Sequence, residues 1–146
     1  MIRYEHRQVG TLVLAVGGLS VLALILLLAF VEANVIGIAV LCCLVPCFAL
    51  FSTLTVAVTE TDVLVKFGPG LIRRRFPLDA IRDARAVRNE WYYGWGIRML
   101  PKGLLYNVSG LDAVELEMKD GQTHRIGTDE PAELSKAIRD ASGMTG

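Results

Sequence analysis

The feature that most constrains this chain is the absence of charge over most of its first 60 residues. No charged residue lies between Arg7 and Glu32, and none lies between Glu32 and Glu60. The two apolar stretches, at about residues 9–31 and 35–54, are each long enough to cross a hydrocarbon core of ~30 Å as a helix. A helix also satisfies its own backbone hydrogen bonds, as lipid requires. The sequence therefore predicts a membrane hairpin of two transmembrane helices.

A cleaved signal peptide is the alternative for the first stretch. Its apolar run is longer than the usual apolar region of a signal peptide, and no A-x-A-like cleavage site precedes the second stretch. We therefore expect residues 1–54 to form an N-terminal membrane anchor in the mature chain. Cys42, Cys43 and Cys47 lie inside the second span, where a thiol serves as a small apolar filler.

The distribution of cations predicts the orientation of the anchor. Arg3 and Arg7 precede the first span, the turn at residues 32–34 carries no Lys or Arg, and further cations follow the second span. The positive-inside rule then places both termini in the cytoplasm, in a multi-pass arrangement. The folded, functional part is expected in residues 55–146, where the formal net charge of zero hides a basic first half and an acidic second half.

After the second span the apolar pattern alternates with the period of a β-strand. The turn signals Gly68-Pro69-Gly70 and Asp120-Gly121 separate several of the β-rich runs. We expect strands at residues 53–59, 62–67, 71–76, 81–88, 95–99, 104–108, 113–118 and 123–127. This pattern predicts an antiparallel, meander-like domain of seven to eight strands.

One amphipathic helix is predicted at the end of the chain, at about residues 129–142. Thr128 is a suitable N-cap, Pro131 is tolerated in the first turn, and Gly143 is a suitable stop. Many short strands followed by one docking helix suggest a barrel that is closed at one end by that helix.

The order of these elements resembles a known family. The strings WYYGWGIR at residues 91–98, GLLYNVSG at 103–110 and RIGTDEP at 125–131 are similar to bacterial membrane proteins that carry a pleckstrin-homology-like domain. The likeness covers nearly the whole chain. It implies an α+β domain, a split antiparallel β-barrel capped by a C-terminal helix, on the cytoplasmic face of a bacterial plasma (inner) membrane. It implies no reaction, because this fold serves many binding tasks.

A basic hairpin is the sharpest local signal for a ligand. Lys66 followed by Arg73, Arg74 and Arg75 is similar to the K-x(n)-[K/R]-x-R pattern with which some eukaryotic pleckstrin-homology domains hold phosphoinositides. Arg73 and Arg75 share a strand face, and Lys66 on the paired strand can converge with them on a phosphate. The alternative is a solvated strand face that only keeps the domain near its own leaflet.

An aromatic run offers a second candidate surface. Trp91, Tyr92, Tyr93 and Trp95, together with Arg98, are residue types that dominate protein interfaces. The rings can instead rest at the lipid interface, or Trp91 and Trp95 can fill the small core. We expect at least one of these two tryptophans in the core.

Catalysis has little support in the sequence. His6 and His124 belong to no metal-ligand or nucleophile pattern, and Glu115 and Glu117 alternate as on the solvated side of a hairpin. We expect no enzyme activity, no cofactor, no metal ion and no nucleic-acid partner.

Three hypotheses follow. The first, which we adopt, is a non-enzymatic membrane-anchored interaction module that forms a homo-oligomer or joins a membrane complex through the region from Trp91 to Arg98. The alternative is a domain that senses anionic lipid headgroups through Lys66 and Arg73 to Arg75. The third is a hydrolase or transferase that uses His124 and nearby carboxylates.

Overall fold

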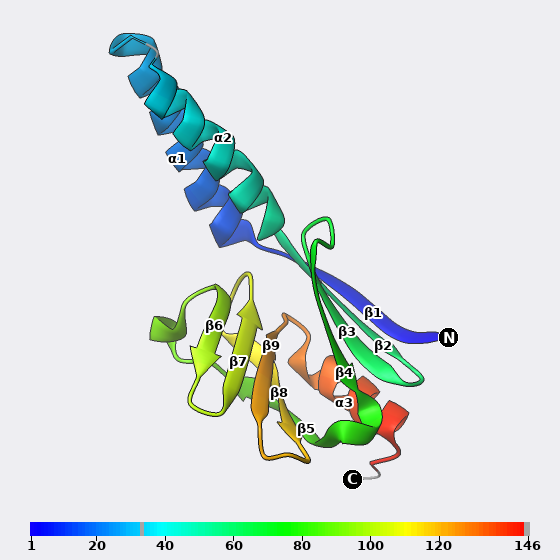
Figure 1. Cartoon of the computed structure of the whole chain (residues 1–146). Coiled ribbons are helices and arrows are strands. Elements are labelled where there is room, and N and C mark those ends of the chain that lie inside the picture. Colours follow the sequence, from blue (N-terminus) through cyan, green and yellow to red (C-terminus); the bar gives the residue numbers. More distant parts are fainter. Residues whose placement is uncertain (33, 145–146) are drawn as a thin grey trace.

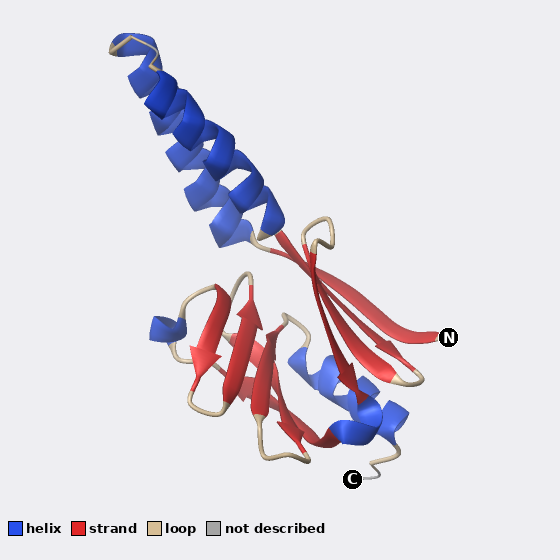
Figure 2. Cartoon of the chain, viewed as in Figure 1, coloured by secondary structure: helices blue, strands red, loops and turns tan. Residues whose placement is uncertain are grey.

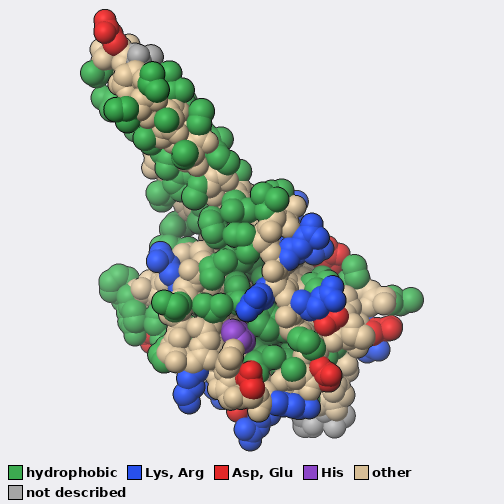
Figure 3. Space-filling view, viewed as in Figure 1, with side chains coloured by type: hydrophobic (Ala, Val, Ile, Leu, Met, Phe, Trp, Pro, Cys, Tyr) green, Lys and Arg blue, Asp and Glu red, His purple; other side chains and the backbone are tan. Residues whose placement is uncertain are grey.

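A helical hairpin projects from a β-rich domain in the computed structural model, which describes residues 1–32 and 34–144 (Figure 1). The hairpin consists of α1 (Thr11–Phe30) and α2 (Val35–Leu50). Apolar side chains cover its exposed surface, as the green atoms in Figure 3 show. α1 is long and apolar enough to cross a membrane, as the sequence predicts. α2 is apolar but shorter, with 16 residues and Pro46 inside it.

Both apolar segments are shorter than the sequence predicts. The first helix was expected over residues 9–31, but Val9 ends a strand and the helix begins at Thr11. The second was expected to reach residue 54, but Thr53 and Leu54 already pair with their neighbours in a sheet. The β-branched residues that follow Leu50 favour this early change to strand.

The first residues form a strand that the sequence analysis did not predict. β1 (Ile2–Val9) pairs antiparallel with β2 (Thr53–Thr59), so residues assigned to the anchor belong to the β domain. The helical hairpin is therefore inserted between two neighbouring strands. The backbone N–H of Gly10 donates to the carbonyl oxygen of Ser52 at 2.7 Å and ties the two helix ends together.

Nine strands form two separate sheets in the described part of the chain (Figure 2). Sheet A has the order β1-β2-β3-β4 and is antiparallel throughout, with β3 (Asp62–Phe67) and β4 (Ile72–Pro77). Sheet B has the order β5-β8-β9-β7-β6. Its strands are β5 (Ile81–Arg88), β6 (Gly96–Leu100), β7 (Gly103–Asn107), β8 (Asp112–Met118) and β9 (Thr123–Gly127). Short 3-10 turns, η1 (Leu78–Ala80) and η2 (Trp91–Tyr93), flank β5.

The predicted strands are confirmed to within one residue at their ends, and sheet A is the predicted antiparallel meander, but the meander is wrong for sheet B. The β8–β9 hairpin lies between β5 and β7, so β7 and β9 become parallel neighbours. This order depends on pairing between residues that are far apart in the sequence, and local periodicity carries no information about such pairing.

α3 (Pro131–Ser142) ends the described fold and packs on the core with fully buried Leu134 and Ile138. It contacts both sheets, most of all β5. Thr128 is not the N-cap, because the helix begins at Pro131 and the Thr128 hydroxyl accepts a hydrogen bond from the Glu130 N–H at 3.1 Å. Gly143 ends the helix in a left-handed conformation, as predicted.

Candidate functional site

The basic hairpin between β3 and β4 lies against the end of α2. The Gly68 N–H donates to the Thr53 carbonyl at 2.8 Å. A Cβ on Gly68 would lie 2.5 Å from the Leu50 carbonyl oxygen, and its φ of +48° also favours glycine. Leu71, at the tip, is 82% exposed. The hairpin therefore carries its cations close to the helix ends.

The strand register divides the four cations of this hairpin between two faces. Lys66 pairs with Arg73, and Leu64 pairs with Arg75, so Lys66, Arg73 and Arg75 share the outer face of sheet A. Arg75 lies 3.9 Å from Asp62, between Nη1 and Oδ2. Arg74 belongs to the opposite face.

Arg74 is directed toward a packed aromatic cluster. Burial raises the pKa of the Tyr106 phenol, although Arg74 opposes this shift. Burial, and next the charge of Arg74, lower the pKa of His124. The Nδ1 atom of His124 accepts a hydrogen bond from the Leu104 N–H at 3.2 Å, and its ring centroid lies 5.0 Å from that of Phe76. His124 is thus a packed ring whose surroundings disfavour its charged form.

The aromatic turn η2 leaves the sheet between β5 and β6 and is directed into solvent. Trp91 is 75% exposed and Tyr92 is 63% exposed, while Trp95 is half-buried. The expectation that one tryptophan fills the core is wrong, because neither Trp91 nor Trp95 belongs to the buried core cluster. Neighbouring rings pack edge to face, with centroids 6.0 Å apart for Trp91 and Tyr92.

The strand that follows this turn extends the exposed surface. β6 is an edge strand, and Met99 is 89% exposed beside the exposed Ile97. Arg98 lies between them in the sequence, and its Nε donates to the Trp95 carbonyl at 3.1 Å. We call the exposed residues Trp91, Tyr92, Ile97, Arg98 and Met99, which lie in the turn before β6 and on β6 itself, the aromatic edge.

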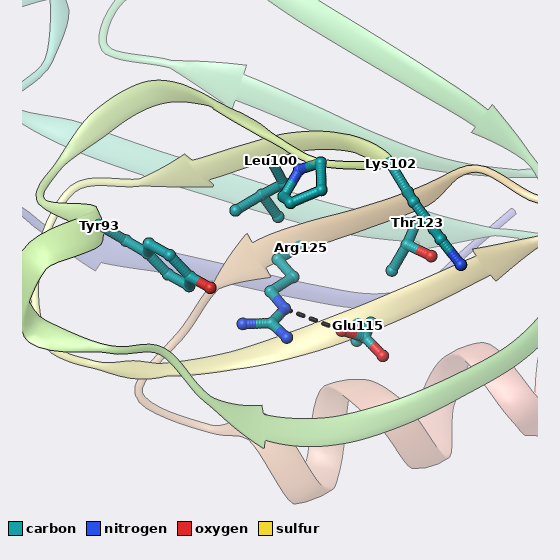
Figure 4. A pocket seen from close by; sticks show the side chains of 7 residues that line it. Tyr93, Leu100, Lys102, Glu115, Thr123 and Arg125 are labelled. Carbon is teal, nitrogen blue, oxygen red and sulfur yellow. Dashed lines mark hydrogen bonds and ion pairs between the residues drawn. The ribbon is translucent and has the colours of Figure 1, made fainter.

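A buried carboxylate lies near the aromatic turn, with Arg125 between it and Tyr93 (Figure 4). Glu115 on β8 is buried, and its Oε2 accepts from Arg125 Nε at 2.8 Å while Arg85 binds Oε1. The interpretation of Glu115 as a solvated strand residue is wrong. The register places Arg85 on β5 and Arg125 on β9 directly opposite it, which becomes visible only with the strand order.

Arg125 connects the Glu115 carboxylate to the aromatic turn. Arg125 Cζ lies 5.8 Å from the centre of the Tyr93 ring, and Arg125 Nη1 donates to Asn89 Oδ1 at 3.2 Å. Burial alone would raise the pKa of Glu115, but the hydrogen bonds from Arg85 and Arg125 outweigh it and hold that pKa below its ordinary value. This network fixes the base of the turn, beside a hollow of about 270 Å³.

Comparison of the chain with protein-family models, curated proteins and solved structures gives no match. The resemblance to bacterial membrane proteins with a pleckstrin-homology-like domain therefore stays a prediction.

A second polar cluster, not anticipated from the sequence, joins β1 to the start of α3. His6 Nε2 lies 2.6 Å from Asp129 Oδ1, its Nδ1 lies 3.3 Å from Glu130 Oε2, and Tyr4 donates to Glu130 at 3.0 Å. Burial, followed by Glu130, raises the pKa of Tyr4. Among the described residues no group of three His, Cys, Asp or Glu side chains is arranged to hold a metal ion. The cluster fastens the first strand to the last helix.

Proposed function

We propose that this chain is a non-enzymatic, membrane-anchored interaction module that binds a protein partner through the aromatic edge. The observation that carries the proposal is the exposure of Trp91 and Tyr92 on a turn whose base is fixed by buried Glu115. Large exposed aromatic side chains on a turn with a fixed base are typical interface hot spots.

The partner is proposed to add to the edge of sheet B. β6 has β7 as its one neighbour in the described chain, so its outer backbone groups face solvent. An edge strand with exposed Ile97 and Met99 offers main-chain hydrogen bonds together with apolar contacts. A subunit of a membrane complex or a second copy of this chain fits such a surface.

The pairing of β1 with β2 supports the predicted two-span anchor. If α1 crosses the membrane, the chain must cross back, since the strands on either side of the hairpin are neighbours in one sheet. At 1.5 Å per residue α2 reaches ~24 Å, a mismatch that bilayer thinning accommodates. Arg3, Arg7 and Lys66 lie beyond the same end of the hairpin, which supports a cytoplasmic domain and cytoplasmic termini.

The β domain also supports the resemblance on which the fold class rests. Two packed sheets followed by a C-terminal helix are the elements of a split barrel capped by a helix. We propose that the domain is pleckstrin-homology-like and is presented at a bacterial plasma membrane.

The test is purification of the full-length protein in native nanodiscs, with native mass measurement. We expect a stoichiometric partner or a defined oligomer. In the W91A/Y92A variant the affinity for the partner, or for the second copy, should fall at least tenfold, because truncation of a hot-spot side chain costs about 2 kcal/mol or more. The matched control R82A/K119A changes exposed residues elsewhere on sheet B and should retain it. A lone monomer in every preparation, or equal loss in the control, contradicts the proposal.

A further inference from the structure

A row of three cations crosses the outer face of sheet A, and it includes a residue from β1 that lies far from the basic hairpin in sequence. Arg7 pairs with Thr55, Thr55 pairs with Lys66, and Lys66 pairs with Arg73. Residues paired across neighbouring strands point to the same face. Arg7, Lys66 and Arg73 therefore form one line around Thr55, which we call the cationic row.

The cationic row lies a short way outside the helix ends. Arg7 is three residues before Gly10, and Thr55 is three residues after Ser52, where the two helix ends are tied. At about 3.3 Å per residue this is roughly 10 Å along the strands. The headgroup layer on each side of a bilayer is ~5–8 Å deep, and long cationic side chains extend toward it.

The side chain of Arg73 turns toward the helices. Its Nε donates to the carbonyl oxygen of Gly70, in the turn that packs on the end of α2. The exposed apolar Leu71 beside this turn extends the hydrophobic surface of the helices onto the hairpin. In Figure 3, Lys and Arg side chains gather around the β3–β4 hairpin beside the apolar base of the helices.

Charge along this face changes with distance from the helices. Within residues 1–32 and 34–144, none of the three cations in the row forms an ion pair. The acids of the same face, Glu5 and Asp62, lie in rows farther from the helix ends, and Asp62 is next to Arg75. Among the described residues, the three cations of the row are thus free of ion pairs at the level where a leaflet surface would lie.

We propose that Arg7, Lys66 and Arg73 bind the phosphate groups of anionic phospholipids in the leaflet next to the domain. This inference rests on the proposed membrane anchoring and is independent of the aromatic edge. Three cations from three strands of one rigid sheet offer a preorganised surface for phosphate oxygens. Arg74, on the other face, and Arg75, beside Asp62, are outside this site.

The test uses full-length protein in mild detergent, titrated with dioleoylphosphatidylglycerol or with dioleoylphosphatidylcholine and followed by native mass spectrometry. We expect tighter binding of the anionic lipid. Each single change, R7Q, K66Q or R73Q, should weaken that binding about fivefold, which corresponds to about 1 kcal/mol for one cation at an anionic surface. The triple variant should weaken it about a hundredfold and leave binding of the zwitterionic lipid unchanged.

The control variant R82Q/K102Q/K119Q removes the same charge from the start of β5 and from two turns of sheet B. It should retain binding of the anionic lipid. Equal loss in the control would mean that only net charge matters and would overturn the proposal. Displacement of the lipid by millimolar glycerol phosphate would instead assign the row to soluble phosphates and would also overturn it.

If circular dichroism shows that the triple variant is not folded, the single variants decide the outcome. Retention of the partner or oligomer by the same preparations reports on the aromatic edge separately. Release of the protein from membranes by a carbonate wash would count against the anchor itself.

Discussion

Glu115 is connected to the aromatic turn through Arg125. It is buried, it accepts hydrogen bonds from two arginines, and one of these, Arg125, reaches both Asn89 and the Tyr93 ring. A buried carboxylate in such a network stabilises a fold only while its partners are present. Its substitution should therefore affect both stability and the turn.

We expect E115Q to lower the free energy of unfolding by about 1–3 kcal/mol at pH 7, since it removes one charge from a buried pair. The carboxyl pKa is lowered in the folded state, so its contribution is complete above the unfolded value of about 4.3 and is lost as pH falls through the folded value. The difference between E115Q and the natural protein should shrink toward zero in acid. Urea unfolding of the full chain in detergent, followed by tryptophan fluorescence, measures both effects.

The control is E117Q, because Glu117 contacts the exposed Arg82 and lies nearer the surface. The E117Q change should lower the free energy of unfolding by no more than about 0.5 kcal/mol. The role assigned to Glu115 would be contradicted if E115Q lowered the free energy of unfolding as little as E117Q does. It would also be contradicted if the stability difference between E115Q and the natural protein grew in acid.

At the scale of elements, local patterns predicted most of the β domain. Most of the strands from β2 to β9 have alternating apolar residues or clear turn signals, and α3 has one apolar face and a glycine stop, so they can be recognised from their own sequence. β1 was missed because Arg3, Glu5 and Arg7 alternate with polar Tyr4, His6 and Gln8, which hides the buried side.

The candidate sites were predicted less completely than the elements. The residue types of the exposed aromatic run and of the basic hairpin are evident in the sequence. The face of the sheet on which each side chain lies depends on strand register. Arg7 joins Lys66 and Arg73 only through the pairing of β1 with β2, and Glu115 meets Arg85 only through the pairing of β5 with β8. These contacts arise from strand order, which a single sequence does not encode locally.

The tight approach of the basic hairpin to α2 gives a prediction for the β3–β4 turn. G68A should destabilise the domain by about 1–3 kcal/mol, because its Cβ would meet the Leu50 carbonyl and its φ is positive. G121A has a similar positive φ but open space around its Cβ, so it isolates the backbone cost of about 1 kcal/mol. Equal losses in the two variants, measured by thermal unfolding, would argue against a packed contact with α2.

For the whole molecule, the insertion of the hairpin between β1 and β2 ties the proposed membrane topology to the sheet pairing. With Cys42, Cys43 and Cys47 replaced by serine, T61C should react with an impermeant maleimide only in inside-out vesicles. E32C, between the helices, should react only in right-side-out spheroplasts. Both residues lie in exposed turns. Reaction of the two positions from the same side would refute the two-span anchor.

The insertion of α1 and α2 between β1 and β2 also has a consequence for biosynthesis. The ribosome releases β1 before the hairpin, yet its neighbour emerges about 50 residues later. Until β2 emerges, β1 has no neighbouring strand to pair with. If β1 stayed on the other side of the membrane, β2 would be left with an open edge. If the two helices insert into a bilayer as proposed, that insertion would also bring β1 beside β2 and so complete sheet A.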